Sequence, residues 1–500
     1  MQKKLLSLML TTWFYGAALF AINLNTSTAN AQAKQYSFDE VMNLVESSSS
    51  VLKAMDGKIS AAELNQSRME KHWSPKLFVD VKSFNTNDPA NVFMSNLQQR
   101  KIENSDFNPD TLNNPDRIQA QKGSLMLDMP LYEGGRPTAL LDITKSQTQL
   151  MSVEKQQQRN QLRAQVFKLY YNLVKLNEEK LKIEKLQATT DKILESYQLR
   201  KNENPVGYSG YLGLKALKEQ LDSQLTSMQQ QKKLIYSSIA ELISTTTTTT
   251  SIESGNESTR NSVKNSMKLS ALPDQWQPEN KSVEQIRQQL EKYISNASKV
   301  SADAQTQGQQ SDSSIKSKIA NTPEYQMAVV QKNMADKNKL VQTSYWKPEL
   351  GAFGETYLMN GSRGTATGNT VGVYLRWGFS GQLVGNVDQA KKEALAAQYY
   401  ADAIEQKITV QTLSQMEGNQ VIETQIKSTE QTLALLEEQT TMMKKLYQSG
   451  AINSLQLVDV FSRHLMLIQQ QSQLKTQWIN NLSNLIQIYG LESGVNHASK

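Results

Sequence analysis

The sequence predicts a membrane α+β protein, in which long antiparallel helices form coiled coils and four short strands contribute to an oligomeric β-barrel. Three observations support this expectation: an N-terminal export signal, long stretches without proline, and four segments in which polar and apolar residues alternate. The same order of elements occurs twice, which predicts two copies of one structural unit.

The N-terminus has the features of a secretory signal peptide. Lys3 and Lys4 precede an apolar run over residues 5–22, and an Ala-x-Ala site ends at Ala33. A basic segment, an apolar segment and a small-residue site in this order are typical of a cleaved signal, although the run is also almost long enough for a membrane anchor. We expect residues 1–33 to be removed and the chain to be exported.

The composition argues against several classes of function. Lys and Arg number 54 against 48 Asp and Glu, and no dense basic run is present, so nucleic-acid binding is not expected. The chain has no cysteine and three widely separated histidines, so neither a metal nor another cofactor is predicted. We find no pair of catalytic carboxylates, phosphate-binding glycine loop or nucleophile motif, and therefore do not expect an enzyme.

Long helices are predicted where proline is absent, because proline disrupts a helix interior. Over residues 162–183, apolar side chains recur at steps of four and three, which is the pattern of a coiled-coil seam. A helix over about 137–197 would be ~90 Å long and must lie along other helices. Two interruptions of the helical pattern predict turns between helices, here called the tips: residues 205–210 and residues 448–453.

Four segments alternate with a period of two and are predicted as strands: residues 77–82, 125–131, 349–358 and 371–379. Such strands fit either a sheet on a soluble core or a membrane barrel with lipid outside and water inside. In the barrel, the charged residues of the polar faces line the lumen, and these are Asp80, Lys82, Asp128 and Arg376. Four strands cannot close a barrel, so several chains must then contribute.

The two copies also predict the domain organisation. Residues 34–243 form the first repeat and residues 313–490 the second, each with a helix, two strands, a long helix, a tip and a helix. Residues 244–312 are a polar linker with one helical piece at 282–295, and residues 491–500 are a tail. The joins between strand and long helix are assigned to Pro130, Gly134, Gly135 and Pro137 in the first repeat, and to Gly378 and Gly381 in the second.

The ordered set of these features resembles the TolC-like outer membrane efflux family. The similarity rests on residues 127–136, on Pro75 and Pro348 at the starts of strands, on residues 320–324 before the second repeat, and on the paired tips. It covers roughly residues 36–490, without the linker.

The resemblance implies a homotrimer with a twelve-stranded barrel in the outer membrane and a helical tunnel across the periplasm. A periplasmic adaptor and an inner-membrane pump would dock at the tips. The chain would then be the passive outer membrane channel of a tripartite efflux or type I secretion system, in contact with outer membrane lipids. The alternative is a structural or adhesive coiled-coil surface protein, which fits the seams but not the strands.

The resemblance also implies roles for residues of the two tips. The expected adaptor contacts are Val206, Gly207, Tyr208, Gly450 and Ala451, and the expected periplasmic entrance is lined by Tyr447 and Asp459. Family members often have Val-Gly-Leu at the first tip, of which two residues are kept here. Ile452 and Gln456 replace an arginine and an aspartate found in some members, so a gate here would depend on Tyr447, Asp459 and packing. Asp459 could equally be an ordinary exposed residue of a helix.

Overall fold

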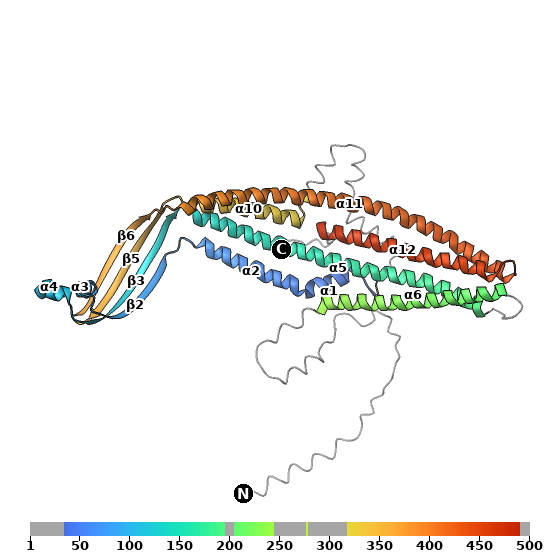
Figure 1. Cartoon of the computed structure of the whole chain (residues 1–500), viewed down its shortest axis with the longest axis horizontal. Coiled ribbons are helices and arrows are strands. Elements are labelled where there is room, and N and C mark those ends of the chain that lie inside the picture. Colours follow the sequence, from blue (N-terminus) through green and yellow to red (C-terminus); the bar gives the residue numbers. More distant parts are fainter. Residues whose placement is uncertain (1–34, 196–204, 245–276, 279–317, 491–500) are drawn as a thin grey trace, which may run out of the picture.

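The computed structural model describes residues 35–195, 205–244, 277–278 and 318–490. The expected signal peptide, nearly all of the expected linker with its helical piece at 282–295, and the expected tail lie outside these ranges. Within them the chain is elongated, with a sheet at one end, a bundle of long helices in the middle, and the two tips at the other end (Figure 1).

The sheet contains four antiparallel strands in the order β2-β3-β5-β6. Their bounds are β2 Lys76–Thr86, β3 Ile118–Glu133, β5 Glu349–Gly361 and β6 Gly364–Arg376. All four were expected, but they are longer, and β3 continues to Glu133, so that Pro130, which was assigned to the join, lies within the strand. A bulge between Pro130 and Tyr132 accommodates the proline, which cannot donate a ladder hydrogen bond. Trp377 and Phe379 lie beyond the end of β6, not within it.

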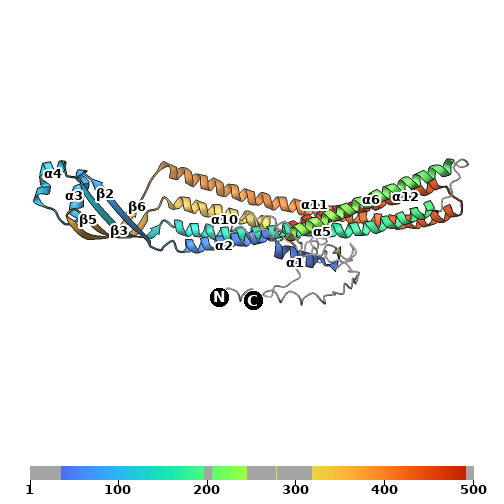
Figure 2. The ribbon, with the colours of Figure 1, turned by 90° about the horizontal axis from the view of Figure 1, so that it is seen from below.

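Long helices extend from the sheet towards the tips (Figures 1 and 2). Two of them, α5 with 60 residues and α11 with 68, are about 90 and 100 Å long at 1.5 Å per residue. The predicted helix over 137–197 corresponds closely to α5. The bounds of the long helices are α2 Ser50–Glu70, α5 Arg136–Glu195, α6 Pro205–Ser244, α10 Pro323–Ser344, α11 Gly381–Gln448 and α12 Ser454–Tyr489.

The beginning of the described chain is fixed against the middle of the bundle. Helix α1, Phe38–Ser48, starts with a capping box between Ser37 and Glu40, and Ser49 separates it from α2. Before it, β1 (Gln35–Tyr36) pairs in parallel with β4 (Gln277–Pro278) from the expected linker. Tyr170 of α5 donates a hydrogen bond of 2.9 Å to the Tyr36 carbonyl.

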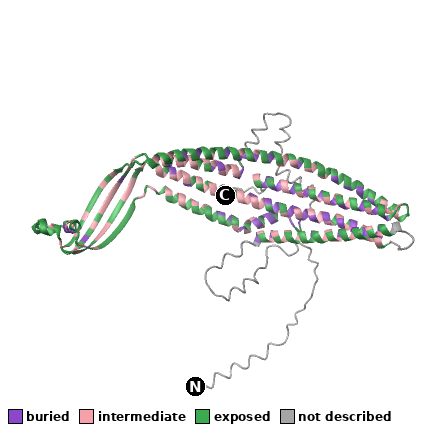
Figure 3. Cartoon of the chain, in the orientation of Figure 1, coloured by how far each residue is buried: buried purple, intermediate pink, exposed green. Residues whose placement is uncertain are grey.

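The apolar seam of α5 is buried as the heptad pattern predicts. Leu173, Leu176 and Ile183 are at most 4% exposed, and they belong to two clusters in which α5 packs with α6 and α12. Buried residues accordingly follow the inner sides of the helices, whereas nearly all residues of the strands are exposed or half-buried (Figure 3). The helical body therefore contains the apolar core of this chain, and the sheet has none of its own.

Residues 87–117, which connect β2 to β3, form a helical cap beyond the sheet (Figures 1 and 2). No helix was expected between these two strands. Instead, the cap consists of α3 (Pro89–Gln98), the 3₁₀ turn η1 (Asn104–Phe107) and α4 (Pro109–Asn113). Asp88 and Asn108 cap α3 and α4 with their side chains, and a proline opens each helix.

Candidate functional site

Every charged residue of the four strands lies on the same face of the sheet. The register places Asp80, Lys82, Asp128 and Arg376, the residues expected in a barrel lumen, together on this charged face. Tyr374 donates a hydrogen bond of 3.1 Å from its hydroxyl to Asp128 Oδ1, and Lys82 Nζ lies 3.3 Å from Asp80 Oδ1. The four side chains are therefore brought to one surface, although they come from three strands.

Glycines on the charged face are covered by aromatic rings from the neighbouring strand. Tyr374 lies over Gly351, Tyr357 over Gly368, and Phe353 over Gly372, across the β5–β6 pairing. A Cβ at Gly351 would lie 2.3 Å from Cζ of Tyr374, so no larger residue fits beneath the ring. Three aromatic rings thus lie flat against this hairpin, as in the aromatic rescue of glycine in designed sheets.

The opposite face of the sheet has no charged side chain and is unpacked. Its most exposed apolar residues include Val371 at 86% and Val79 at 72%. The uncharged face extends about 27 Å along the strands, at 3.4 Å per residue. Leu375 and Leu350 lie at one end of it, and Val81 and Leu358 at the other. An exposed apolar surface of this extent marks contact with a partner or a membrane.

The two outer strands of the sheet are open. β2 pairs only with β3, and β6 pairs only with β5, among the residues that the structure describes. Their outer backbone groups are available to further strands. An open edge of this length in a folded chain is a template for pairing with another chain.

The first strand–helix join turns sharply at two glycines. Gly134 and Gly135 have φ of 69° and 85°, a region that disfavours residues with a side chain. A Cβ at Gly134 would also lie 2.5 Å from the Ser344 carbonyl oxygen. Helix α5 then begins at Arg136, with Pro137 in its first turn, and Arg136 bonds to Glu133 at 2.7 Å and to Glu349 at 3.0 Å.

The second join is built differently. Gly378 and Gly381 do not have positive φ, and a Cβ at either position would meet no other atom within 4 Å. Aromatic contacts replace the glycine turn: Trp377 donates a hydrogen bond of 3.1 Å to the Trp346 carbonyl and its ring centroid lies 4.9 Å from that of Phe379. The two joins therefore connect a strand to a long helix with different chemistry.

The expected adaptor-contact residues lie in a helix at the first tip and in a turn between helices at the second. Val206, Gly207 and Tyr208 lie in the first turn of α6, not in a loop before it, which corrects the expected turn at 205–210. Gly450 and Ala451 do lie in the turn between α11 and α12, where Gly450 has φ of 77°.

The helices on either side of the tips approach one another closely. A Cβ on Gly210 of α6 would lie 1.9 Å from Ser454 Oγ, and one on Gly213 would lie 3.2 Å from a methyl carbon of Val458. The spacing of these two glycines on one helix face was a signal for this contact that our reading of the sequence did not use.

The two residues expected at the entrance lie near the tips but in different surroundings. Tyr447, in the last turn of α11, packs against the apolar cluster of α5, α6 and α12. Asp459, in α12, is more than half exposed and pairs with Arg463 one turn later at 2.7 Å. This geometry fits both readings of Asp459, the entrance residue and the ordinary helix residue.

A ladder of partly buried polar contacts joins α5 to α12 and α11. Lys475, only 6% exposed, lies 2.7 Å from Glu178 and 3.8 Å from Glu430. Lys182 donates a hydrogen bond of 2.6 Å to Gln471, and Lys175 one of 2.8 Å to Thr476. Burial lowers the pKa of Lys175 and of Lys182 from its usual value. We did not anticipate this polar layer, because the partners are far apart in sequence.

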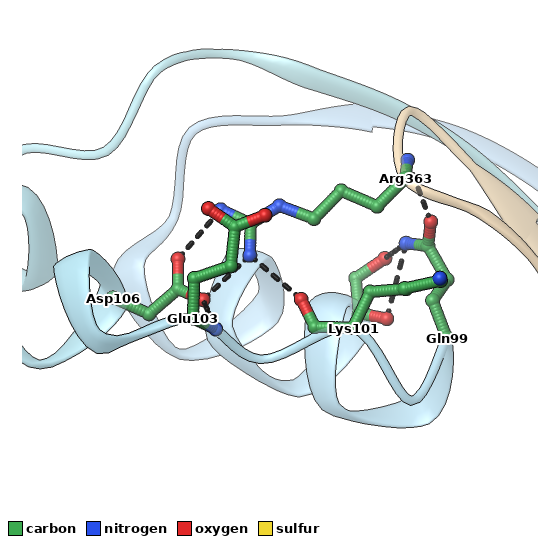
Figure 4. Close-up of polar contacts among 6 residues, drawn as sticks. Gln99, Lys101, Glu103, Asp106 and Arg363 are labelled. Atoms are coloured by element: carbon green, nitrogen blue, oxygen red, sulfur yellow. Dashed lines mark hydrogen bonds and ion pairs between the residues drawn. The ribbon is translucent and has the colours of Figure 1, made fainter.

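The cap is attached to the β5–β6 turn by Arg363 (Figure 4). Its guanidinium forms two bonds to Asp106, of 2.5 and 2.6 Å, and one of 2.8 Å to the Lys101 carbonyl. Its backbone N–H donates to Gln99 Oε1 at 3.0 Å. Asp106 is 5% exposed, and its hydrogen bond with Arg363 holds the pKa of the carboxyl below its usual value.

The described residues include neither a membrane-spanning helix nor a group of metal ligands. None of the helices in the described ranges is both long and apolar enough to cross a membrane. Within the same ranges, no three His, Cys, Asp or Glu side chains are grouped so that they could bind a metal ion.

Comparison with known proteins finds a family match in the C-terminal part of this chain. Residues 314–491 match the model of a family described as outer membrane efflux protein. No curated protein matches the sequence. The family match confirms, for these residues, the resemblance to the TolC-like outer membrane efflux family.

Solved structures share the fold over nearly the whole chain. A membrane protein from Pseudomonas aeruginosa is 12% identical, with a TM-score of 0.67 and 94% of each chain covered. The outer membrane protein VceC from Vibrio cholerae is 12% identical, with a TM-score of 0.64 over 91% of this chain and 96% of that chain. The MtrE outer membrane channel from Neisseria gonorrhoeae, in its open state, is 11% identical, with a TM-score of 0.64 over 91% and 88%. The expected outer membrane location agrees with these relatives.

Proposed function

We propose that this chain is the outer membrane channel of a tripartite efflux or type I secretion system, and that it acts as a passive homotrimeric duct. The observation that carries the proposal is the four-stranded sheet with a charged face, an uncharged face and two open edges. In a bilayer every backbone polar group must be paired, so such a sheet is complete only when its edges meet other sheets.

The need to pair the open edges supports several copies of this chain in one barrel, and we propose three. Three copies of a four-stranded sheet make twelve strands, with β6 of one chain beside β2 of the next. The uncharged face would then contact lipid, where charges cost roughly 2–4 kcal/mol at the midplane. Asp80, Lys82, Asp128 and Arg376 would face the water-filled lumen.

The helical body would continue the lumen across the periplasm. α5 and α11 start directly at the two joins, so the barrel and the helices would form one conduit. We propose that the tips bind a periplasmic adaptor through Val206, Gly207, Tyr208, Gly450 and Ala451, and that Tyr447 and Asp459 line the entrance. The energy for transport would come from an inner-membrane pump, and no cofactor is part of the proposal.

The test is the state of the mature protein in cell fractions and in the electron microscope. We expect heat-modifiable trimers, whose migration in gel electrophoresis changes on heating, in the outer membrane fraction. In the electron microscope they should appear as hollow, tapered cylinders. A thin solid stalk would instead support the structural or adhesive alternative, and a soluble periplasmic monomer would contradict both.

Adaptor binding has its own test. Gly207→Trp should abolish transport and leave trimers in the outer membrane, whereas Gly385→Trp, in the first turns of α11 far from the tips, should leave transport intact. Normal transport by the Gly207→Trp variant would show that the first tip does not contact the adaptor.

A further inference from the structure

Helix α10 begins close to the end of helix α12, and a cavity of about 330 Å³ lies at this junction. The two helices follow one another along the bundle (Figure 1), and Ile488 near the end of α12 packs against the cluster that contains Ala328 of α10. The lining also includes Gln157 of α5 and Gln411 of α11. The cavity therefore lies where four helices meet, and its volume is at the lower end of the range for small-molecule sites.

Amide side chains gather around this cavity. Four of them have no hydrogen-bond partner among the described residues, and these are Gln157, Gln411, Asn484 and Gln487. Three of the four are exposed and Gln157 is half-buried, so all remain accessible, and polar atoms provide most of the surface of the cavity. Each amide has two donor hydrogens and an acceptor oxygen. These four side chains can therefore bond to a molecule in the cavity both as donors and as acceptors.

The charged side chains of the lining are paired with each other. They are Lys407 and Glu324, and Lys407 Nζ lies 2.7 Å from Glu324 Oε1. Their charges cancel, so the cavity has no net charge that would attract an anion or a cation. Pro323 and Ile488 add apolar surface. A matching ligand is uncharged, has several groups that both donate and accept hydrogen bonds, and has some carbon–hydrogen surface.

We infer that this cavity binds one ring of a neutral sugar. A sugar ring has hydroxyl groups around its edge, each able to donate and to accept, and carbon–hydrogen groups on its faces. The hydroxyl groups would bond to Gln411, Asn484 and Gln487, and one face of the ring would contact Ile488. Such a ligand would touch α10, α11 and α12 and would stabilise their junction. The site includes neither the sheet nor the tips, so the failure of the proposed duct would not remove it.

Binding can be measured by calorimetry with methyl α-glucoside and with tetrahydropyran-2-methanol, which has the same ring but a single hydroxyl group. The sample is the full-length mature chain in a detergent without a sugar headgroup. We expect methyl α-glucoside to bind about tenfold or more tightly, because the other compound lacks three of the hydroxyl groups. Maltotriose shows the source of the ring: tighter binding than methyl α-glucoside indicates a glycan chain, and equal binding a free sugar.

Two variants on different helices test the amides. Asn484→Leu and Gln411→Leu each remove one amide at similar volume, and each should weaken the binding of methyl α-glucoside about fivefold, the factor for one net hydrogen bond. Gln477→Leu, at an exposed position of α12 outside the cavity, is the control and should bind as the original chain does. Thermal unfolding of each variant without ligand shows whether the fold is intact.

Three results would overturn the inference. The first is equal affinity for methyl α-glucoside and tetrahydropyran-2-methanol, or no binding of either at millimolar concentration. The second is unchanged affinity in both Asn484→Leu and Gln411→Leu. The third is tighter binding of N-acetylglycinamide, an uncharged peptide analogue, because the amides would then recognise a peptide backbone and not a sugar.

Discussion

Arg363 and Asp106 form a bidentate ion pair of 2.5 and 2.6 Å between residues that lie 257 positions apart. Asp106 belongs to η1 of the cap in the first repeat, and Arg363 to the turn between β5 and β6 in the second. Gly361 leaves room for Gln99 beside the pair, because a Cβ there would lie 2.7 Å from Nε2 of Gln99. The two halves of the chain, which the sequence predicts to be repeats, are therefore connected at the far end of the sheet by side chains as well as by β-strand pairing.

Asp106→Asn should release the cap. The change removes the charge from a buried acceptor of Arg363, and bonds to charged groups of this kind contribute about 2 kcal/mol. Hydrogen exchange followed by mass spectrometry should show faster exchange over residues 87–117, with the helical body unchanged. Asp110→Asn, at an exposed position of α4, is the control and should leave exchange as it was. Equal exchange in the two variants would show that the pair does not hold the cap.

Attachment of the cap should depend on pH only in strong acid. The bond from Arg363 lowers the pKa of Asp106 in the folded chain, so the contribution of the pair is complete above the ordinary carboxyl pKa of about 3.9. It is lost as pH falls through the lowered value. Limited proteolysis should therefore cut the cap equally slowly at pH 7 and pH 5, and faster only below about pH 4. Loss of protection near pH 6 would contradict this assignment.

Gly351 and Gly354 should respond differently to the same substitution. In Gly351→Ala the new methyl group would collide with the ring of Tyr374 and disturb its bond to Asp128, at a cost of about 1–3 kcal/mol. Gly354 lies in the same strand, and a Cβ there would meet nothing within 4 Å. Thermal unfolding of purified protein should show a lower Tm for Gly351→Ala and an unchanged or higher one for Gly354→Ala. If both variants had the same change in Tm, the ring of Tyr374 would not be held rigidly over Gly351.

Lys475→Met should destabilise the helical body. The lysine is almost fully buried, and Glu178 and Glu430 would lose its charge. Both carboxylates retain contact with water, so we expect about 2 kcal/mol, below the usual cost of breaking a fully buried pair. Denaturant unfolding measures this loss. Adding Glu178→Gln to Lys475→Met should recover part of it, and Lys58→Met at an exposed position of α2 should have little effect.

Single cysteines can test which face of the sheet is in contact with water. The chain has no native cysteine, so each label reports one position. In outer membranes, Asp128→Cys should react with a charged maleimide, while Leu127→Cys, its neighbour on the opposite face, should react only with a lipophilic one. The reverse pattern would exclude the proposed orientation of the sheet, and equal reaction with the charged reagent would exclude a lipid-facing surface.

Much of this architecture could be predicted because it depends on local patterns. The seam over 162–183 and the absence of proline predicted the long helix α5 and its start to within one residue. Alternation in the strands predicted which residues share a face, because successive side chains of a strand point to opposite faces of the sheet. The cap was missed because its helices are short and have no periodic pattern. The turn at 205–210 was wrong because its glycines suit close helix packing as well as a loop.

The candidate site was predictable only in part for the same reason. Asp80, Lys82, Asp128 and Arg376 could be grouped from alternation within each strand, without knowing the pairing. The bond of Arg363 with Asp106 and that of Lys475 with Glu178 could not be predicted in this way. Each of these residues has many other charged residues in the sequence as alternative partners.

The sequence by itself determined the elements of this protein, their amphipathic faces and their repetition, because hydrophobic periodicity and proline placement act over a few residues. Only the tertiary structure decided which elements meet: the strand order β2-β3-β5-β6, the covering of Gly351 by Tyr374, the polar ladder of α5 and α12, and the attachment of the cap by Arg363. These contacts join residues far apart in the chain, and they form only when the helices and strands have packed.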